Sequence, residues 1–231
     1  MVVTPVTDED VDWVVDVLRR RREALVRHAP VFWRPVPDAD ARHRAYLDHL
    51  LAGAGARAWR TSSSVLLAAR RGDGWLVDDV HVEGWTAAGV NLWNAFASSC
   101  GGDDVRFVVP TYETTRAEHA AAAGLTIVES WWLLEPPSSG GGEAGVKVRL
   151  PGSEAVTVAA PPVYAPPGPM LFLPIVTDVA ALPAAVDRAP GLGCAGVVVR
   201  QRPGDETVGQ AMTGRGFRRH CDFFEGVVRP V

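Results

Sequence analysis

The sequence lacks the features that mark secreted, membrane-spanning or disulfide-stapled chains. Its three cysteines, Cys100, Cys194 and Cys221, lie far apart and form no CxxC pair, which argues against a disulfide framework or a zinc site. No run approaches the ~20 apolar residues needed to span a bilayer. Residues 2–18 contain five acidic and no basic residues, so they do not resemble a secretory signal. We therefore expect a cytoplasmic protein that does not bind membranes.

An excess of positive charge is also absent. The 231 residues carry a formal net charge of −4 with a pI near 5.9, which argues against general binding of nucleic acid or anionic membranes. The one basic run is Arg19 to Arg22. We expect it on a solvated helix face, with a polyanion or phosphate contact as the alternative. Hydrophobic residues at 47% and charged residues at 22% are typical of a folded domain.

Tryptophan is missing from the later part of the chain. All eight tryptophans precede residue 133, and a run rich in Pro, Gly and Ser, residues 136–142, follows at once. Such a composition is typical of flexible connectors. The sequence therefore predicts a domain at 1–135, a linker at 136–145 and a second domain at 146–231.

An internal repeat is the most informative feature that is present. The pattern strand, helix, strand, helix, strand occurs twice, at a shift of about 92 residues, and such self-similarity limits the possible folds. The first copy comprises residues 75–82, 85–98, 106–109, 113–123 and 125–134, and the second comprises 170–176, 178–189, 195–201, 205–215 and 217–228. The pattern predicts an α/β protein.

The first strand of the repeat carries an unusual number of polar residues. Side chains alternate between the two faces of a strand. This alternation predicts two sets: Trp75, Val77, Asp79, His81 and Glu83 on one face, and Leu76, Asp78, Val80 and Val82 on the other. If Asp78 were buried without a partner, its pKa would rise. Asp79, His81 and Glu83 could bind a metal, but ligands on a single strand rarely converge, and we expect no metal site.

Four motifs within residues 1–135 resemble a known superfamily. They are Ala29-Pro30-x-Phe32-Trp33-Arg34, Val77-Asp78-Asp79-x-x-Val82, Trp85-x-x-x-Gly89-x-x-Leu92 and Glu129-Ser130-Trp131-Trp132. Together with the element order, they resemble the GNAT (N-acetyltransferase) superfamily, and more closely a group of actinobacterial GNAT-like proteins. The resemblance implies an α/β fold with a GNAT-like mixed sheet flanked by helices, and a second, smaller half-GNAT domain that is a degenerate repeat.

The resemblance also implies that the first copy binds acetyl-CoA or another acyl-CoA. In the superfamily the pantetheine arm enters between two splayed strands. The pyrophosphate lies on backbone amides at the start of the next helix, where N–H groups and the helix dipole favour an anion. The matching positions here are Val82, Thr86, Ala87, Ala88, Gly89 and Val90, of which only Gly89 fits the superfamily's phosphate-loop pattern. The second copy has no glycine at this place, and we expect it to bind no cofactor.

Members of the superfamily often protonate the departing thiolate with a tyrosine. Ala120 occupies that position in the first copy and Met212 in the second, and neither can donate a proton. Tyr112 and His119 are nearby candidates for the role in this chain.

A base is needed to deprotonate an ammonium nucleophile. The strand carboxylates Asp79, Asp78 and Glu83 are the candidates, although each could instead pair with an arginine of the N-terminal helices or cap a helix. The candidate residues for binding the acceptor are Phe32 and Trp33 on the loop between the first two helices, His81, and Trp132, whose neighbour Trp131 must point to the opposite face of its strand.

The leading hypothesis is transfer of an acetyl or other acyl group from acyl-CoA to the amine of a small molecule. One alternative is a catalytically degenerate GNAT-fold protein that binds a ligand or a partner. Another is a GNAT-fold biosynthetic enzyme repurposed for a different reaction. The chain could act as a monomer or a homodimer.

Overall fold

The computed structural model describes residues 2–53, 55–135 and 140–231. The strands of its mixed sheet are β1 (Thr4–Pro5), β2 (Ala56–Arg60), β3 (Val65–Arg71), β4 (Gly74–His81), β5 (Asp104–Pro110), β6 (Thr126–Leu134), β7 (Lys147–Leu150), β8 (Ser153–Val158), β9 (Met170–Leu173), β10 (Gly196–Gln201) and β11 (Arg218–Val227). Their order in the 11-stranded sheet is β1-β2-β3-β4-β5-β11-β6-β10-β9-β8-β7.

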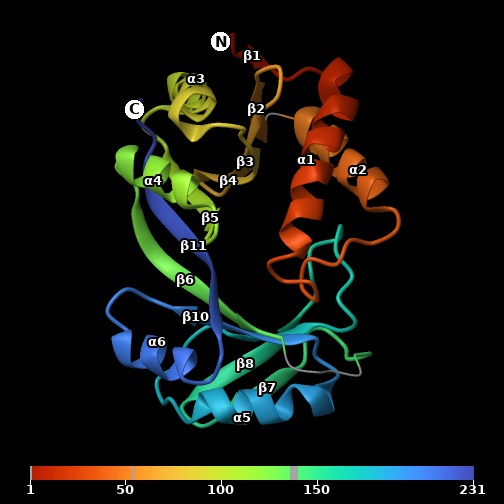
Figure 1. The fold of residues 1–231 in the computed structure, drawn as a ribbon, viewed down its shortest axis with the longest axis vertical. Coiled ribbons are helices and arrows are strands. Elements are labelled where there is room, and N and C mark those ends of the chain that lie inside the picture. The colour runs from red at the N-terminus through yellow and green to blue at the C-terminus, as the bar shows by residue number, and fades with distance from the viewer. Residues whose placement is uncertain (1, 54, 136–139) are drawn as a thin grey trace. The chain divides into compact units, whose positions relative to one another are not determined.

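The helices are α1 (Val11–Val26), α2 (Ala39–Leu51), α3 (Val90–Cys100), α4 (Thr114–Ala122), α5 (Ala181–Arg188) and α6 (Glu206–Thr213), with short turns η1 (Asp8–Asp10), η2 (Trp85–Gly89) and η3 (Pro190–Leu192). The predicted repeat is visible in this order: β4, α3, β5, α4 and β6 are followed later by β9, α5, β10, α6 and β11 (Figure 1). The α/β class and the mixed sheet agree with the sequence prediction.

The chain forms two compact units that do not follow the predicted domains 1–135 and 146–231. Unit 1 comprises residues 1–21, 40–128 and 222–231, and unit 2 comprises 22–39 and 129–221. Strands β6 and β11 have residues in both units, so the division falls within these strands.

The predicted linker lies only partly within the described residues, because residues 136–139 fall outside them. Its described part is hydrogen-bonded to the rest of unit 2 rather than extended. The backbone N–H of Gly141 donates to Pro167 O at 2.9 Å, and that of Gly145 donates to Thr157 O at 2.7 Å. Residues 140–145 therefore make backbone contacts with unit 2, which their composition did not indicate.

Unit 1 has helices on both faces of its part of the sheet, and alternate side chains of β3 pack against the helices of each face. Val65, Leu67 and Ala69 pack against α1 and α2. The intervening Leu66 and Ala68 join the core beneath α3 and α4. All five are buried, as expected for a strand covered on both faces, and Figure 1 shows α1 and α2 on the opposite side of β2–β4 from α3 and α4.

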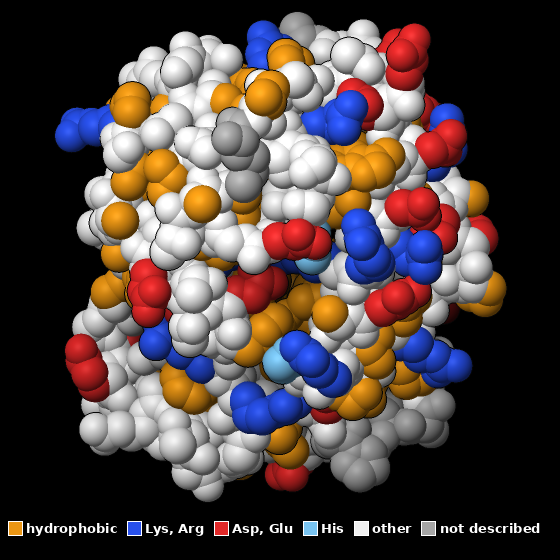
Figure 2. Space-filling view, turned by 45° about the horizontal axis from the view of Figure 1, so that its top comes forward, with side chains coloured by type: hydrophobic (Ala, Val, Ile, Leu, Met, Phe, Trp, Pro, Cys, Tyr) orange, Lys and Arg blue, Asp and Glu red, His pale blue; other side chains and the backbone are white. Residues whose placement is uncertain are grey.

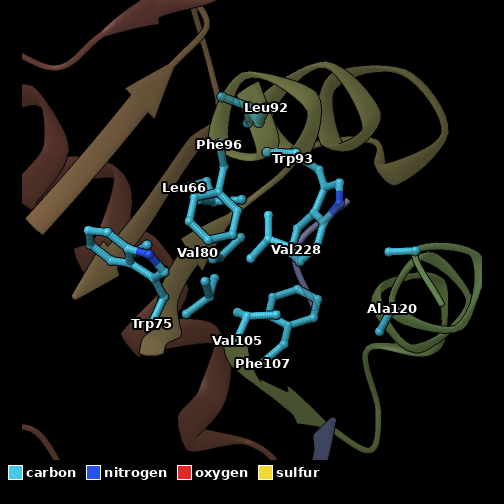
Figure 3. Close-up of a cluster of buried hydrophobic side chains, with 14 of the residues drawn as sticks. Leu66, Trp75, Val80, Leu92, Trp93, Phe96, Val105, Phe107, Ala120 and Val228 are labelled. Carbon is cyan, nitrogen blue, oxygen red and sulfur yellow. The ribbon is translucent and has the colours of Figure 1, made fainter. Parts of the chain in front are cut away.

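The larger core of unit 1 is rich in aromatic side chains. Figure 3 shows Leu66 and Val80 from the strands meeting Phe96 of α3 and Phe107 of β5. Trp93 is fully buried, and its indole N–H donates to Arg229 O at 2.8 Å, which satisfies the one polar atom that the ring brings into the core. Four of the eight tryptophans, Trp59, Trp75, Trp85 and Trp93, lie in this core.

A β-bulge in β4 overturns the predicted alternation. In the ladder with β3, Leu66 pairs with Val80 and Ala68 pairs with Val77, so Asp78 and Asp79 together oppose Leu67. The extra residue shifts the side-chain parity. Trp75, Val77 and Val80 therefore all enter the same core, whereas the alternation had placed Val80 opposite the other two.

The parallel pair β4–β5 is paired only at its beginning. The ladder runs from Trp75–Val105 to Val77–Phe107, although β4 continues to His81 and β5 to Pro110. In the second copy, β9 pairs with β10 along its whole length, from Met170–Gly196 to Leu173–Val199. The first copy is thus the one in which the two strands separate.

Unit 2 has two cores on opposite faces of its strands. Trp131 packs on the cluster that contains Leu133 and Met170, and Trp132 packs on the cluster that contains Leu171 and Met212. The prediction that the two neighbouring tryptophans point to opposite faces is confirmed.

Acidic and basic side chains are interspersed on the face of the molecule shown in Figure 2, together with scattered hydrophobic ones. Among the described residues, no helix combines the length and the apolar character that a membrane span requires.

Candidate functional site

A pocket of about 270 Å³ lies at the ends of β4 and β5 in unit 1. Nine residues line it: Arg21, Val80, His81, Val82, Trp85, Tyr112, Glu113, Thr114 and Thr115. Because β4 and β5 run parallel, the segments that follow them leave the sheet at the same edge. The residues after β4 and the β5–α4 connection therefore meet there.

Two arginines bind the backbone at the bulge beside this pocket. Arg21 Nη1 of α1 donates to Asp78 O at 3.2 Å, and Arg116 Nη2 of α4 lies 3.4 Å from the same oxygen. Both side chains also meet Glu113: Arg116 Nη1 is 3.2 Å from Glu113 Oε2, and Arg21 Nε is 3.7 Å from Glu113 Oε1. A carbonyl that is no longer part of the β4–β5 ladder thus gains guanidinium partners.

Arg116 is fully buried, with 0% of its side chain exposed. Its guanidinium carbon lies 4.7 Å from the ring centroid of Phe107 and 5.9 Å from that of Trp85. A buried cation is costly unless it is paired, and Glu113 and these aromatic faces supply the compensation. Arg116 therefore ties α4 to the separated strands.

The charges of the pocket follow from this network. Burial acts to raise the pKa of Glu113, but Arg116 and Arg21 outweigh it and hold the pKa below its ordinary value. Burial, together with Arg20 and Arg21, lowers the pKa of His81 from 6.5. At neutral pH the pocket therefore contains an ionised carboxylate and a neutral imidazole.

The three carboxylates predicted as bases do not line the pocket. Asp79 Oδ2 lies 3.6 Å from His43 Nε2 of α2. Asp78 is exposed, but the surrounding protein removes part of the hydration of its carboxyl group. This desolvation raises the pKa of Asp78, and the negative charge of Asp79 raises it further. Glu83 is exposed, and its backbone N–H donates to Ser64 Oγ at 3.1 Å.

The predicted phosphate loop forms the π-helical turn η2 and the start of α3. The N–H groups of Ala87 and Gly89 both donate to Gly84 O, at 3.3 and 3.0 Å, so they are already engaged. Thr86 and Ala87 are exposed, Ala88 and Gly89 are buried, and Val90 is half-buried. A phosphate could reach only the exposed tip of this turn directly.

The two candidates for the acid lie in different surroundings. Tyr112 lines the pocket. His119 is 5% exposed, its ring centroid lies 4.8 Å from that of Trp85, and burial and then Arg116 lower its pKa to about 4. Ala120, at the superfamily's tyrosine position, is fully buried in the core. His119 is therefore neutral at physiological pH and suits packing better than proton donation.

Of the candidate acceptor residues, only His81 lines this pocket. Phe32 and Trp33 belong to unit 2, where they form an aromatic cluster with Tyr164 and His220 whose ring centroids lie 4.5–5.3 Å apart. Trp132 also belongs to unit 2, and its indole N–H donates to Gln201 Oε1 at 2.7 Å.

Sequence reasoning missed several residues of the site. Arg21 belongs to the basic run expected on a solvated face, yet only 12% of its side chain is exposed. Glu113, Thr114 and Thr115 line the pocket but carry no motif. No local signal distinguishes the buried Arg116 from a surface arginine on a helix. Among the described residues, no group of three or more His, Cys, Asp or Glu side chains is placed to hold a metal.

Comparison with solved structures identifies the fold. The chain superimposes on provisionally assigned acetyltransferases from Thermoplasma acidophilum (TM-score 0.56, 10% identity, 98% of this chain and 100% of that one) and Pyrococcus horikoshii (TM-score 0.52, 8% identity, 99% and 90%). It also superimposes on a GCN5-related N-acetyltransferase from Sphaerobacter thermophilus (TM-score 0.51, 10% identity, 99% and 96%). The chain has the GNAT acetyltransferase fold. At these identities the likeness establishes the fold alone, and the sequence matches no protein-family model and no curated protein.

Proposed function

We propose that the protein transfers an acyl group, acetyl in the simplest case, from acyl-CoA to the amine of a small molecule. The observation that carries the proposal is the separation of β4 from β5 after the Val77–Phe107 pair, with a pocket at the place where the strands part. The closer resemblance to actinobacterial GNAT-like proteins remains a prediction.

The separated strand edge suits an extended chain that contains amides. Among the described residues, no strand pairs with β4 on the β5 side beyond Val77. The backbone groups of β4 past the bulge that point away from β3 can therefore face a ligand. The pantetheine arm of CoA carries two amide groups and can add to such an edge in the manner of a strand. The thioester would then lie in the pocket next to Tyr112, the candidate proton donor for the thiolate.

The pyrophosphate of CoA fits this site less well than the pantetheine arm does. Gly89 is the one residue that follows the superfamily's pattern, but its N–H is used within η2 and its α-carbon faces Trp85. Thr86 and Ala87 are exposed at the tip of the turn and are the residues that a pyrophosphate would contact. We therefore expect the pantetheine arm to contribute more of the affinity than the phosphates.

Isothermal titration with acetyl-CoA tests the proposal, and two variants of α4 provide a matched pair. Thr115 and Ala121 are both exposed, but only Thr115 lines the pocket. Thr115→Trp should fill the pocket and abolish micromolar binding, whereas Ala121→Trp should leave it unchanged. Absence of binding to the wild-type protein at millimolar acetyl-CoA would overturn the proposal.

A second candidate is a GNAT-fold protein that binds a ligand without transferring an acyl group. The buried Ala120 at the superfamily's tyrosine position favours it. Acetyl-CoA binding without turnover of any amine in a mass-detected screen would support this candidate. A repurposed enzyme would be favoured instead by a pocket ligand unrelated to CoA.

A further inference from the structure

We infer that His81 is the proton acceptor for the incoming amine, and that Glu113 is the carboxylate that stabilises the resulting imidazolium. This inference rests on the proposed acyl transfer and adds its base. Both side chains line the same pocket, His81 from the end of β4 and Glu113 from the position before α4.

The location favours His81 over the strand carboxylates. A base must lie within hydrogen-bond reach of the proton that it removes. Neither Asp79 nor Asp78 lines the pocket, and Asp79 already faces His43. His81 is half-buried at the pocket wall, on the same strand edge where the pantetheine arm would end.

The charged groups around His81 set its protonation. Burial disfavours the imidazolium most, and Arg20 and Arg21 of α1 add to this effect, whereas Glu83 and Glu113 favour the imidazolium. The net result is a neutral imidazole at pH 7, ready to accept a proton. Because Glu113 is ionised, it offers the charge that an imidazolium needs once the proton has moved.

Arg116 is the positioning residue of this pair. It contacts Glu113 Oε2 at 3.2 Å and is itself fixed between Phe107 and Trp85. One oxygen of Glu113 is thereby anchored from the interior, and Arg21 meets the other oxygen. The carboxylate is held in one orientation before any ligand binds, which is the form of preorganisation that efficient catalysis requires.

The attacking nitrogen loses two protons as it changes from an ammonium group to an amide. The ammonium group gives one proton to the His81 imidazole, and the freed lone pair of the nitrogen forms the C–N bond to the acyl carbon. The C–S bond breaks, and its electron pair leaves on the CoA sulfur. The second proton of the attacking nitrogen passes to that sulfur by way of Tyr112 or water, and His81 returns its proton to solvent.

The first measurement uses the protein without substrate, so its result does not depend on turnover. The pKa of His81 is measured by NMR in the wild type and in Glu113→Gln, with assignment from the missing signal in His81→Gln. The inference predicts a pKa below 6.5 in the wild type and a further decrease in Glu113→Gln, because the variant removes a neighbouring negative charge. An unchanged pKa would show that the two groups do not interact, which would overturn the pairing.

The second arm measures acetyl-CoA affinity and then amine acylation against pH. His81→Gln should bind acetyl-CoA within about threefold of the wild type, lose on the order of 100-fold in kcat, and lose the acidic limb of the pH profile. Exposed His49 of α2 provides the control variant His49→Gln, which should behave as wild type. Acylation that survives His81→Gln with an unaltered pH profile overturns the inference but leaves the proposed function standing. Failure of the wild type to bind acetyl-CoA overturns both.

Discussion

Gly89 lies directly beneath the indole ring of Trp85. A Cβ built at position 89 would lie 2.5 Å from Trp85 Cε3 and 3.0 Å from Cδ2. The backbone of Gly89 is ordinary right-handed helix, with φ −62° and ψ −46°, so the position needs a glycine for space and not for its dihedral angles. The residue that best matches the superfamily's phosphate loop thus has a packing role of its own.

Gly89→Ala should therefore destabilise the protein. In an unobstructed helix the change would stabilise by up to about 1 kcal/mol, but forcing a methyl group against a buried ring costs about 1–3 kcal/mol. Urea unfolding should show a lower midpoint. Gly84→Ala is the matched control in the same loop, because nothing lies within 4 Å of a Cβ there. Equal stability of the two variants would contradict the packing role.

Arg116→Met should be among the most destabilising single changes in unit 1. It leaves Glu113 and the Asp78 carbonyl without their buried partner, and breaking a buried ion pair costs about 3–5 kcal/mol. Exposed Arg20 of α1 supplies the control Arg20→Met, which changes the net charge equally and should cost less than about 0.5 kcal/mol. Chemical denaturation of both variants measures the difference, and similar losses would contradict the burial of Arg116.

His119 should make stability depend on pH. Its pKa is lowered from 6.5 to about 4 in the folded protein, so between these values the unfolded chain binds a proton that the folded chain does not. The free energy of unfolding therefore falls as pH falls through this window, by an amount on the order of 1–3 kcal/mol.

The pKa of His220 is also lowered to about 4, so His220 lowers the free energy of unfolding over the same pH range. A variant of His119 is therefore needed to separate the contributions of the two histidines. His119→Gln should be less stable than the wild type at pH 7, and this deficit should shrink towards pH 4.5. Exposed His49→Gln should track the wild type throughout. A deficit that is constant with pH would show that His119 titrates normally.

Thr86→Glu tests the exposed tip of η2 as the place of the pyrophosphate. A carboxylate beside a phosphate costs about 1 kcal/mol at a solvated surface, so acetyl-CoA affinity should fall by about fivefold. Ala45 of α2 is also exposed, and Ala45→Glu adds the same charge to a surface outside the pocket lining. Equal affinities in isothermal titration would place the pyrophosphate elsewhere.

Trp132→Phe tests whether Trp132 has a structural role in unit 2. The change removes the hydrogen bond to Gln201 Oε1, which is 2.7 Å long, and should cost about 1 kcal/mol of stability. A double-mutant cycle with Gln201→Met should recover a coupling of similar size. Absence of coupling, with a higher KM for the acceptor amine, would restore Trp132 as a substrate-binding residue.

Local patterns in the sequence determined the elements and their repetition. The alternation of strand-like and helix-like segments is a property of neighbouring residues, so the elements of the two copies and their order could be predicted before any tertiary contact was known. The same patterns, with four short motifs, were enough to indicate the GNAT fold.

The tertiary structure decided the composition of the site. The bulge at Asp78 and Asp79 arises from the register between β3 and β4, and it moved the side chains of β4 to faces that strict alternation could not predict. Arg116 is buried because Glu113, Phe107 and Trp85 come to it from separate elements. The pocket exists because β4 and β5 part after Val77. Charge pairing and strand separation depend on residues that are distant in the chain, and no local pattern encodes them.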